Sequence, residues 1–566
     1  MAYLANNTIY SIPSTLIVLL VVSTCIGLAI SIFARRSRPL IQLPGPPAGN
    51  WTTGHFKNIM GLNGIEYQEQ LVVDYGPTMK LNGAFGSEFL RVHVIQEELI
   101  YTIDPGITYA VLVKDKARFE RARGLTLFMR SVWGGGLPTL PGNGYLISRS
   151  LVICPGRALT RKCQLPIFTD IAKQTCQGIK DELKTAKSSS NEVDVFPWAT
   201  VAALELIGEA GLGYSFNSFT GERNKYHNAI KSVAEVAAEV APFAKILPFV
   251  YKIGTPSFRR WALKHVPWDS IQRLRYAVEV QNQQAEEVLR AREALIASGD
   301  DLSSHIGRGR DIMTLLMKAN EEEGSEFHID RDTMVGHMNN LVFAGHETSS
   351  TAVARILGVL ANLPDVQEKL REEVDEYFEK TSGESGDGLL ELPYLDAIVR
   401  EALRLYGPVP FIVRVCCKDS VVSLDYPVET PTGKISSLLI KKGTRIIIST
   451  TMSNRYWQAW GDRAHEFFPE RWITYKHGEV TQPGIHLPGV YSSMITFGGG
   501  SHACIGFKFA VMEIKVMISQ LIKKFKFEPS QEELEWEVST VQFPYLRKER
   551  NDPDRRPKLP LKVVAI

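Results

Sequence analysis

The sequence predicts a mostly helical protein with small β-sheets, an α+β fold class, preceded by a single N-terminal transmembrane helix. Three observations support this prediction. Long apolar-periodic segments fill the middle and the end of the chain, short β-type segments cluster at 411–451, and an uncharged apolar segment occupies 12–33. Helices repeat apolar residues every three to four positions, whereas strands are short and rich in β-branched residues.

The apolar segment at 12–33 is long enough to cross a membrane. Its 22 residues would span about 33 Å as a helix, which covers a hydrocarbon core of about 30 Å. A cleavable signal peptide is the alternative, but it would have a basic amino end and a shorter apolar stretch. Arginines at 35, 36 and 38 follow the segment, so the positive-inside rule places the rest of the chain in the cytosol.

Behind these arginines, residues 43–50 read LPGPPAGN. Three prolines and two glycines in eight residues exclude a helix and predict a stiff hinge. We therefore expect a lumenal tip and transmembrane anchor at 1–34, a basic, proline-rich hinge at 35–50, and one large domain at 51–566.

Within that domain, residues 160–330 are mostly helical in pattern, and 331–362 is the strongest helix candidate, ending before Pro364. The other expected elements are helices at about 364–379, 392–406 and 507–525 and a strand within 444–451.

Composition excludes several classes of function. A formal net charge of +2 over 566 residues, without a basic tract, gives no electrostatic basis for nucleic-acid binding. The seven cysteines are scattered without a CxxC pair, which does not resemble a disulfide framework and favours a reducing compartment. Neither GxGxxG nor GxxxxGK[ST] occurs, so dinucleotide or nucleoside triphosphate binding through those loops is not expected.

One cysteine stands in an unusual setting. Residues 497–506 read FGGGSHACIG, directly before an apolar helix. Cys504 is either an ordinary buried thiol or a thiolate that binds a metal. The surrounding glycines allow the backbone to approach a flat, large group. A lone cysteine lacks the partners that zinc requires, whereas a haem iron needs only one protein thiolate.

This segment resembles the haem-binding loop of the cytochrome P450 superfamily, Phe-x-x-Gly-x-(Arg or His)-x-Cys-x-Gly. The matching positions are Phe497, Gly500, His502, Cys504 and Gly506. The resemblance covers about residues 40–566 and looks closest to membrane-anchored fungal members. It implies the cytochrome P450 fold, with Cys504 as the axial ligand of the haem iron and His502 near a haem propionate.

Two further motifs of the family concern a structural triad. Glu401 and Arg404 stand three residues apart in a predicted helix, where an ion pair is common and contributes little by itself. Residues 467–472, FFPERW, look like the family segment whose arginine joins that pair. The resemblance therefore implies a buried triad of Glu401, Arg404 and Arg471.

A third motif lies inside the long helix. A glycine in a helix costs about 1 kcal/mol relative to alanine, and a Glu-Thr pair is awkward among apolar residues, yet residues 344–349 read AGHETS. In the family this stretch crosses the distal face of the haem. The resemblance implies that Gly345 makes room for dioxygen and that Glu347 and Thr348 deliver protons.

Other family positions are carried over singly. Arg414 falls where the family often has a haem-propionate arginine, and Arg149 can be placed on an arginine of helix C. The remaining sequence of 136–158 departs from the family pattern, because the tryptophan and the other basic residues of that pattern are missing from it. Phe411, Ile412 and Phe543 fall in segments that usually line the substrate pocket, although each could equally belong to the core.

The resemblance implies a monooxygenase that inserts one oxygen atom from O2 into a lipophilic substrate, such as a terpenoid secondary metabolite. The cofactor would be haem b (iron protoporphyrin IX). Electrons would come from NADPH through a separate flavoprotein, the NADPH–cytochrome P450 reductase, with cytochrome b5 as a further donor. The expected location is the endoplasmic reticulum membrane, with the catalytic domain in the cytosol.

Two alternatives remain open at this point. Some haem-thiolate relatives are isomerases or dehydratases that need no O2, but these tend to lack the acid–alcohol pair present at 347–348. The other alternative is a catalytically decayed, haem-binding membrane protein, which the divergent segment at 136–158 makes plausible.

Overall fold

The computed structural model describes residues 43–47, 49–50, 53–83, 98–140, 160–185, 191–220, 247–298, 311–321, 329–475, 480–552 and 555–566, with scattered positions between 229 and 246. The expected transmembrane helix at 12–33 lies outside these residues, as does most of the divergent segment at 136–158. In the described part helices predominate and the sheets are small, as the sequence predicts.

The helices follow the chain in a simple order. The α-helices are α2 (Phe56–Ile59), α3 (Gly64–Tyr75), α4 (Pro105–Tyr109), α5 (Arg123–Trp133), α7 (Thr160–Thr185), α8 (Val195–Leu206), α10 (Leu247–Val250), α11 (Pro256–Lys264), α12 (Asp269–Ala297), α13 (Ile312–Glu321), α14 (Arg331–Ala361), α15 (Pro364–Lys380), α16 (Pro393–Leu405), α17 (Thr450–Ser453), α18 (Trp457–Trp460), α19 (Arg471–Thr474) and α20 (Phe507–Lys524). Two π-helical segments, η1 (Ala110–Lys114) and η5 (Ile207–Leu212), continue α4 and α8.

Four small sheets accompany the helices in the described part of the chain. The largest has the order β1 (Thr78–Asn82), β2 (Glu98–Thr102), β8 (Arg445–Ser449), β5 (Phe411–Cys416) and β3 (Phe119–Glu120). Strands β2 and β8 pair in parallel, and the other pairs in this sheet are antiparallel. The smaller sheets contain β10 (Leu534–Val538) with β11 (Gln542–Leu546), β4 (Glu192–Asp194) with β12 (Pro560–Ala565) and β9 (Phe525–Pro529), and β6 (Ser420–Thr430) with β7 (Gly433–Ile440).

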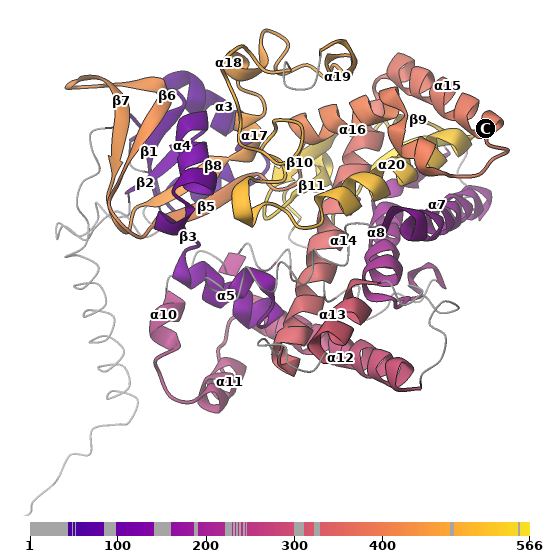
Figure 1. The fold of residues 1–566 in the computed structure, drawn as a ribbon, viewed down its shortest axis with the longest axis horizontal. Helices are drawn as coiled ribbons and strands as arrows, with labels where there is room; N and C mark the ends of the chain where they lie inside the picture. Colours follow the sequence, from indigo (N-terminus) through magenta and orange to yellow (C-terminus); the bar gives the residue numbers. More distant parts are fainter. Residues whose placement is uncertain are drawn as a thin grey trace, which may run out of the picture.

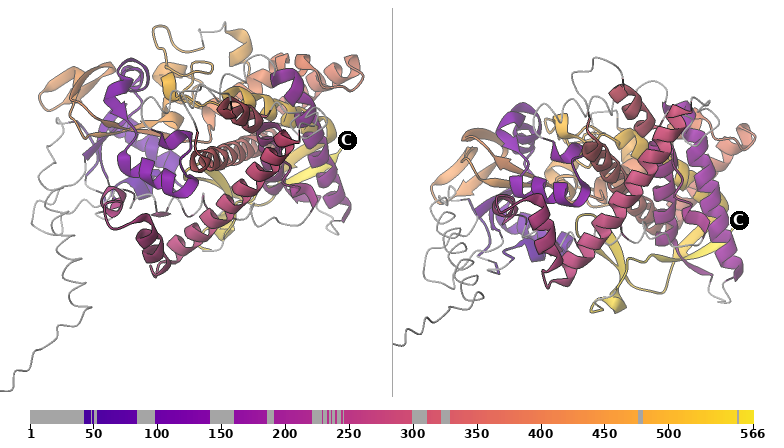
Figure 2. Two further views of the ribbon diagram at one scale, coloured as in Figure 1. Left: turned by 60° about the horizontal axis from the view of Figure 1, so that its bottom comes forward. Right: turned by 90° about the horizontal axis from the view of Figure 1, so that it is seen from below.

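The long helix α14 runs through the middle of the molecule. In Figure 1 the largest sheet and the β6–β7 hairpin lie on the left, and the helices α7, α15, α16 and α20 lie on the right. Figure 2 shows α14 and the other long helix, α12, in two further views. Helix α14 packs against α8, α20 and α12, and its buried residues include polar ones, such as His337, Asn339 and Ser349, beside the apolar ones.

Local sequence explains where α14 begins. Asp330 is in an extended conformation, and its side chain accepts a hydrogen bond from the backbone N–H of Thr333 at 2.7 Å. This N-cap satisfies one of the donors that a helix start leaves without an intrahelical partner. The helix ends at Ala361, and Pro364 begins α15, in agreement with the predicted boundary.

One helical segment of the described residues is long and apolar enough to cross a membrane. It is Val195–Leu212, and 78% of it is buried inside the protein. It is therefore placed as a core helix, packed against α14 and α7.

Part of the expected hinge packs onto the large sheet. The carbonyl of Pro44 accepts a hydrogen bond from the backbone N–H of Lys80 at 2.8 Å, and Leu43 is 4% exposed. A Cβ on Gly45 would lie 2.1 Å from the Lys80 carbonyl oxygen. Residues 43–45 are thus attached to β1, and the domain boundary at residue 50 stays a prediction.

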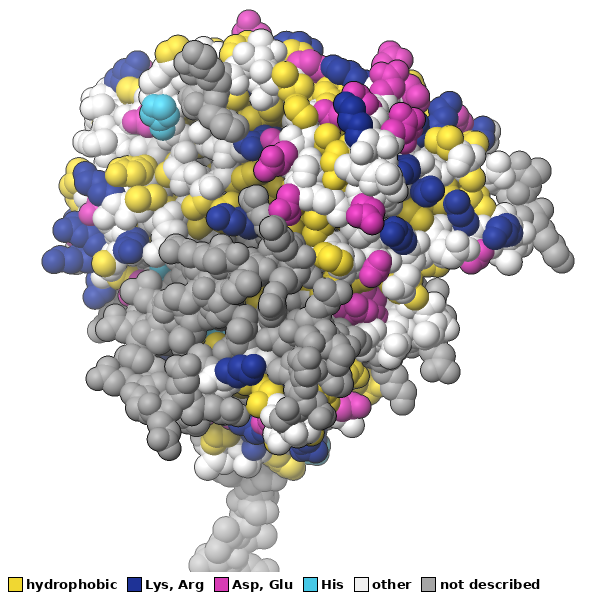
Figure 3. All heavy atoms as spheres, turned by 45° about the vertical axis from the view of Figure 1, so that its right-hand side comes forward, with side chains coloured by type: hydrophobic (Ala, Val, Ile, Leu, Met, Phe, Trp, Pro, Cys, Tyr) yellow, Lys and Arg dark blue, Asp and Glu magenta, His cyan; other side chains and the backbone are white. Residues whose placement is uncertain are grey.

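The surface carries charges of both signs. On the face shown in Figure 3, Lys and Arg side chains are interspersed with Asp and Glu and with hydrophobic side chains. A mixed pattern of this kind does not create a strong field of one sign over the described part of that face.

Candidate active site

A large cavity lies between α14, the Cys504 loop and the start of α20. Its volume is about 1900 Å³, larger than the roughly 300–1,000 Å³ of most small-molecule sites. It has room for a flat cofactor and a substrate together. The apolar part of its wall includes Leu125, Met129, Ile207, Leu341, Val409, Phe411 and Ile412.

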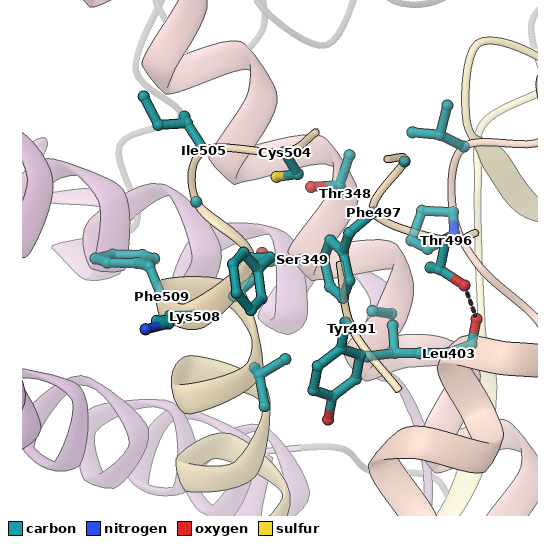
Figure 4. A pocket seen from close by; sticks show the side chains of 18 of the residues that line it. Thr348, Ser349, Leu403, Tyr491, Thr496, Phe497, Cys504, Ile505, Lys508 and Phe509 are labelled. Carbon is teal, nitrogen blue, oxygen red and sulfur yellow. Dashed lines mark hydrogen bonds between the residues drawn. The ribbon is translucent and has the colours of Figure 1, made fainter. Parts of the chain in front are cut away.

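Cys504 lies on the wall of this cavity with an exposed side chain. Its backbone N–H donates to the Phe497 carbonyl at 2.8 Å, which closes the loop into a compact turn. Helix α20 begins three residues later at Phe507, with Gly506 as its N-cap. The free N–H groups and the dipole of a helix start favour a thiolate nearby. In Figure 4 Cys504 and Thr348 are drawn close together at the same cavity.

The two predicted glycines of this loop, Gly500 and Gly506, are present for different structural reasons. Gly500 has φ +64°, and a Cβ there would lie 2.0 Å from the carbonyl oxygen of Leu112 in η1. Any other residue would therefore be strained and would displace the loop. A Cβ on Gly506 would meet nothing within 4 Å, and this glycine lines the cavity. Gly500 fixes the loop on its outer side, whereas Gly506 leaves space inside.

Phe497 also lines the cavity and is held by two aromatic rings. The ring of Tyr491 meets it edge-on, with centroids 5.5 Å apart, and the ring of Phe507 lies 6.0 Å away. Since the Phe497 carbonyl accepts from the Cys504 backbone N–H, this packing also restricts the cysteine. Figure 4 shows Tyr491 and Phe497 on one side of the loop.

Two of the predicted propionate partners reach the cavity. His502 lines it, and its Nδ1 lies 3.3 Å from Ser501 Oγ. Arg414 lines it from strand β5, is 8% exposed, and donates from Nη1 to the Val413 carbonyl at 2.9 Å. Arg149, the third predicted partner, lies outside the described residues.

Thr348 is the residue of the predicted acid–alcohol pair that faces the cavity. It lines the wall together with Ala344 and Gly345. Its hydroxyl donates to the carbonyl oxygen of Ala344 at 2.6 Å, one turn earlier in α14. This bond fixes the hydroxyl oxygen at the cavity wall, where its lone pairs can accept a further hydrogen bond.

The other two predicted residues of this motif, Glu347 and Gly345, occupy different positions relative to the cavity. Glu347 is 3% exposed and is not part of the cavity wall that the described residues form; its Oε1 lies 3.4 Å from Nδ1 of His346. Gly345 borders the cavity, and a Cβ there would lie 3.0 Å from Cγ1 of Ile207. The absent side chain thus makes room for Ile207, and the roles in proton delivery and dioxygen access stay predictions.

The structure brings the predicted triad together. Arg404 donates from Nε to Oε2 of Glu401 at 2.9 Å and from Nη2 to Oε1 at 2.8 Å. Arg471 Nε lies 3.5 Å from Glu401 Oε1. Glu401 also accepts from the Trp472 indole N–H at 2.9 Å and from the Phe468 backbone N–H at 3.1 Å. The group is buried behind the site and contributes to the fold.

The three residues predicted to line the substrate pocket fall into two groups. Phe411 and Ile412 line the cavity. Phe543 instead is 3% exposed in the core, where its ring meets that of Phe196 edge-on with centroids 6.3 Å apart.

Several residues of the cavity wall belong to no motif by which the sequence could have singled them out. They are Leu112, Arg121, Ile207 and Leu341, contributed by four separate segments. Glu513 is different, because a single acid between Met512 and Ile514 in an apolar helix is a recognisable anomaly. It lies in the cavity wall, is 1% exposed, and accepts a hydrogen bond from the Ser349 hydroxyl.

The residues present fit a haem. A thiol is exposed to the cavity at Cys504, cationic candidates line the same cavity at His502 and Arg414, and Gly506 leaves space beside them. A single thiolate is sufficient protein ligation for a haem iron. Among the described residues, no group of three or more His, Cys, Asp or Glu side chains could hold a metal ion by itself.

Comparisons with known proteins agree with this arrangement. The family model described as Cytochrome P450 matches residues 44–544. Cytochrome P450 monooxygenases 91 and 219 of Postia placenta are each 33% identical over 531 residues, which cover 93% of this chain and 94% of each relative. The ganoderic acid synthetase of Ganoderma lucidum is 31% identical over 541 residues, with the same coverage of both chains.

A match over most of the chain, together with relatives above 30% identity across nearly their full length, establishes the family. Along the chain, the long helix that lines the cavity comes first, the buried triad follows, and the Cys504 loop comes last. The chain belongs to the cytochrome P450 family and is a cytochrome P450 monooxygenase.

Proposed function

We propose that this monooxygenase inserts one oxygen atom from O2 into a lipophilic secondary metabolite, such as a terpenoid, with electrons from NADPH through a separate flavoprotein reductase. The proposal rests on the observation that Cys504 and Thr348 line the same cavity, whose wall is largely apolar. One relative is named for the synthesis of ganoderic acid, which supports a search among secondary metabolites.

Cys504 would bind the haem iron through its sulfur, and His502 and Arg414 would bind the propionates. Arg414 suits this role because a guanidinium stays charged and can bind a carboxylate with two hydrogen bonds. When bound, haem supplies the chemistry of dioxygen activation, in which the cysteine thiolate favours cleavage of the O–O bond.

The chain's own residues would orient the substrate and control protons. Leu125, Met129, Ile207, Leu341 and Val409 form apolar wall, which binds lipophilic molecules and excludes water. The Thr348 hydroxyl, held by the Ala344 carbonyl, can accept a hydrogen bond from a donor in the cavity. Glu347 would be the acid that supplies protons to Thr348. A change of its side-chain rotamer would have to bring its carboxyl toward the cavity.

The first test is spectroscopic. The purified ferrous protein should give the thiolate-type absorption band with carbon monoxide, and C504A should abolish it. C417A is the matched control, because Cys417 is a partly exposed cysteine directly after β5 and is not part of the cavity wall that the described residues form. A wild-type protein without the band would refute the haem-thiolate assignment.

The second test separates a monooxygenase from the rearranging relatives. Candidate lipophilic compounds are screened for a spin-state shift of the haem, and each hit is assayed with NADPH and a reductase, then with a peroxide alone. We expect turnover that needs NADPH, reductase and O2. Turnover of a peroxide substrate without O2 would favour an isomerase or dehydratase, and a band without any turnover would favour a decayed haem binder.

The membrane assignment is tested separately. We propose that residues 12–33 anchor the protein in the endoplasmic reticulum membrane, with the catalytic domain in the cytosol. A protein lacking residues 1–34 should lose carbonate-resistant membrane association while it keeps the carbon monoxide band. Unchanged carbonate-resistant association would contradict the anchor.

A further inference from the structure

Arg121 lies beside Arg414 in the wall of the cavity. Both residues line it, and they come from neighbouring strands of the largest sheet. Strands β3 and β5 pair antiparallel, with Glu120 opposite Val415. Because Arg121 follows Glu120 and Arg414 precedes Val415, the next position of this register brings the two arginines side by side.

Strand β5 also approaches the Cys504 loop (residues 497–506). A Cβ on Gly498 would lie 3.6 Å from Cδ1 of Ile412, which stands two residues before Arg414 in β5. Successive side chains of a strand alternate between its faces, so Ile412 and Arg414 share a face. Arg414 therefore stands on the face of β5 that meets the Cys504 loop.

Arg121 is connected to the same loop through η1. A Cβ on Gly500 would lie 2.0 Å from the carbonyl oxygen of Leu112 in η1, and Leu112 lines the cavity. From η1 the chain passes through η2 (Lys116–Arg118) and β3 to Arg121. The two arginines thus belong to segments that pack against the loop of the cysteine.

The two arginines give this edge of the cavity a concentration of positive charge. Like charges at neighbouring positions of a sheet repel each other. Glu120, the acid next to Arg121 in the sequence, is exposed and is not part of the wall that the described residues form. The acids of that wall are Asp387, Glu391, Asp396 and Glu513, on η10 (Asp387–Glu391), α16 and α20. An anion bound by both Arg121 and Arg414 would offset their repulsion.

Both guanidinium groups are oriented by backbone carbonyls. Arg121 donates from Nη1 to the Pro138 carbonyl at 2.9 Å, and Arg414 donates from Nη1 to the Val413 carbonyl, also at 2.9 Å. A guanidinium carries five N–H donors in a rigid planar fork. A bond to a carbonyl therefore restricts the plane of the fork and is compatible with a two-bond contact to a carboxylate.

We propose that Arg121 binds a propionate carboxylate of the haem together with Arg414. The proposal rests on haem binding at Cys504, which is part of the proposed function. A carboxylate of a lipophilic acid substrate has the same chemistry, but both arginines stand on segments that pack against the Cys504 loop, which favours the haem as its source. Arg121 would then replace a contact of the divergent segment at 136–158, from which the tryptophan and the other basic residues of the family pattern are missing.

The first experiment measures haem loss from the full-length holoprotein to excess apomyoglobin, which does not depend on turnover. R121Q should lose haem about tenfold faster than wild type, because a hydrogen bond between ionised groups contributes roughly ten- to hundredfold to an equilibrium constant. R123Q is the matched control, since Arg123 is exposed at the start of α5 and is not part of the cavity wall that the described residues form. Equal rates in R121Q and R123Q would overturn the proposal.

The second experiment separates a propionate contact from a structural role of Arg121. Wild type and R121Q are reconstituted with haem b and with its dimethyl ester, in which neither propionate is a carboxylate. We expect wild type to lose the ester faster than haem b, and the difference between wild type and R121Q to disappear with the ester. A defect of the same size with both haems would show that Arg121 only holds the Pro138 carbonyl, and the proposal would be wrong.

The third experiment tests a substrate acid as the source of the carboxylate. Dodecanoic acid and its methyl ester are titrated into wild type and R121Q, and the spin state of the haem is followed. Equal effects of the substitution on the acid and on the ester would support the haem as the ligand. A selective loss of affinity for the acid, with haem loss as in wild type, would assign Arg121 to the substrate and overturn the proposal.

R121K provides an independent variant if R121Q does not fold. Lysine keeps the charge but lacks the planar fork, so haem loss should be faster than in wild type and the propionate bending bands of the resonance Raman spectrum should shift. Unchanged bands and unchanged haem loss in R121K would contradict the proposal. If wild type instead lacked the carbon monoxide band, the proposed function would fail, while the dependence of haem loss on Arg121 and on the propionates would still be measured.

Discussion

Arg404 and Glu401 form two hydrogen bonds, of 2.9 and 2.8 Å, in a region where both side chains are fully buried. Three backbone carbonyls, those of Asn454, Ala464 and Glu466, accept the remaining hydrogens of Arg404. One arginine therefore ties α16 to the segment that precedes α19.

The first prediction follows from this pair. R404M should lower the free energy of unfolding by about 3–5 kcal/mol, because it leaves the Glu401 carboxylate buried with one fewer cationic partner. K184M is the control, since Lys184 and Asp181 form a pair of the same i,i+3 spacing whose side chains are 71% and 55% exposed. Chemical denaturation of both variants checks the prediction. Equal losses would show that burial of the pair does not matter.

The second prediction concerns the close approach of Gly500 to η1. G500A should be more destabilised than G443A and should bind haem poorly. Both glycines have positive φ, +64° and +91°, but a Cβ on Gly443 would meet nothing within 4 Å. G443A therefore incurs only the strain of a left-handed conformation, about 1–2 kcal/mol. Thermal unfolding and the carbon monoxide band are the measurements, and a G500A as stable as G443A would contradict the contact with Leu112.

The third prediction concerns Thr348. T348A should lower the ratio of product to NADPH consumed by roughly tenfold or more, because a positioned proton-transfer group contributes about 10²–10⁴-fold to the rate of the step it serves. T348S keeps the hydroxyl that bonds to the Ala344 carbonyl and should retain most of the coupling. The measurement is product and NADPH in parallel with a hit from the ligand screen. Unchanged coupling in T348A would remove Thr348 from proton delivery.

The fourth prediction concerns stability at acid pH. Burial lowers the pKa of His337 in α14 to about 4 from 6.5, and its Nδ1 accepts from the Leu137 backbone N–H at 3.3 Å. The unfolded chain therefore binds this proton first as pH falls. The stabilisation from neutral His337 is complete above pH 6.5 and is lost toward pH 4, by about 1.4 kcal/mol per pH unit.

H337N tests this prediction, because its amide oxygen can replace Nδ1 as the acceptor but does not titrate. Between pH 6.5 and 4 the free energy of unfolding should fall less steeply in H337N than in wild type, as measured by chemical denaturation at several pH values. Parallel slopes for the two proteins would contradict a neutral, buried His337.

Much of the helical part of this fold could be predicted from sequence. The helices expected at 331–362, 364–379 and 507–525 correspond to α14, α15 and α20 within one or two residues, because their apolar period and proline boundaries are local features. The relation of Glu401 to Arg471 came from a resemblance, since nothing local predicts which distant arginine meets a given carboxylate.

Other parts depend on contacts that no local pattern encodes. The space that Gly345 leaves is filled by Ile207 of η5, and only the packing of α14 on α8 shows this. Glu513 could have been noticed as a single acid in an apolar stretch, but its partner Ser349 comes from another helix. Side-chain pairs between helices follow from tertiary packing, whereas helix boundaries follow from sequence neighbours.

The contact between Gly500 and the Leu112 carbonyl also has a consequence for assembly of the protein. These two segments are far apart in the chain, and contacts of large sequence separation form late because closing the intervening chain costs entropy. The cysteine loop should therefore reach its final shape only after the amino-terminal part has docked. We expect capture of the prosthetic group by Cys504 to follow this docking.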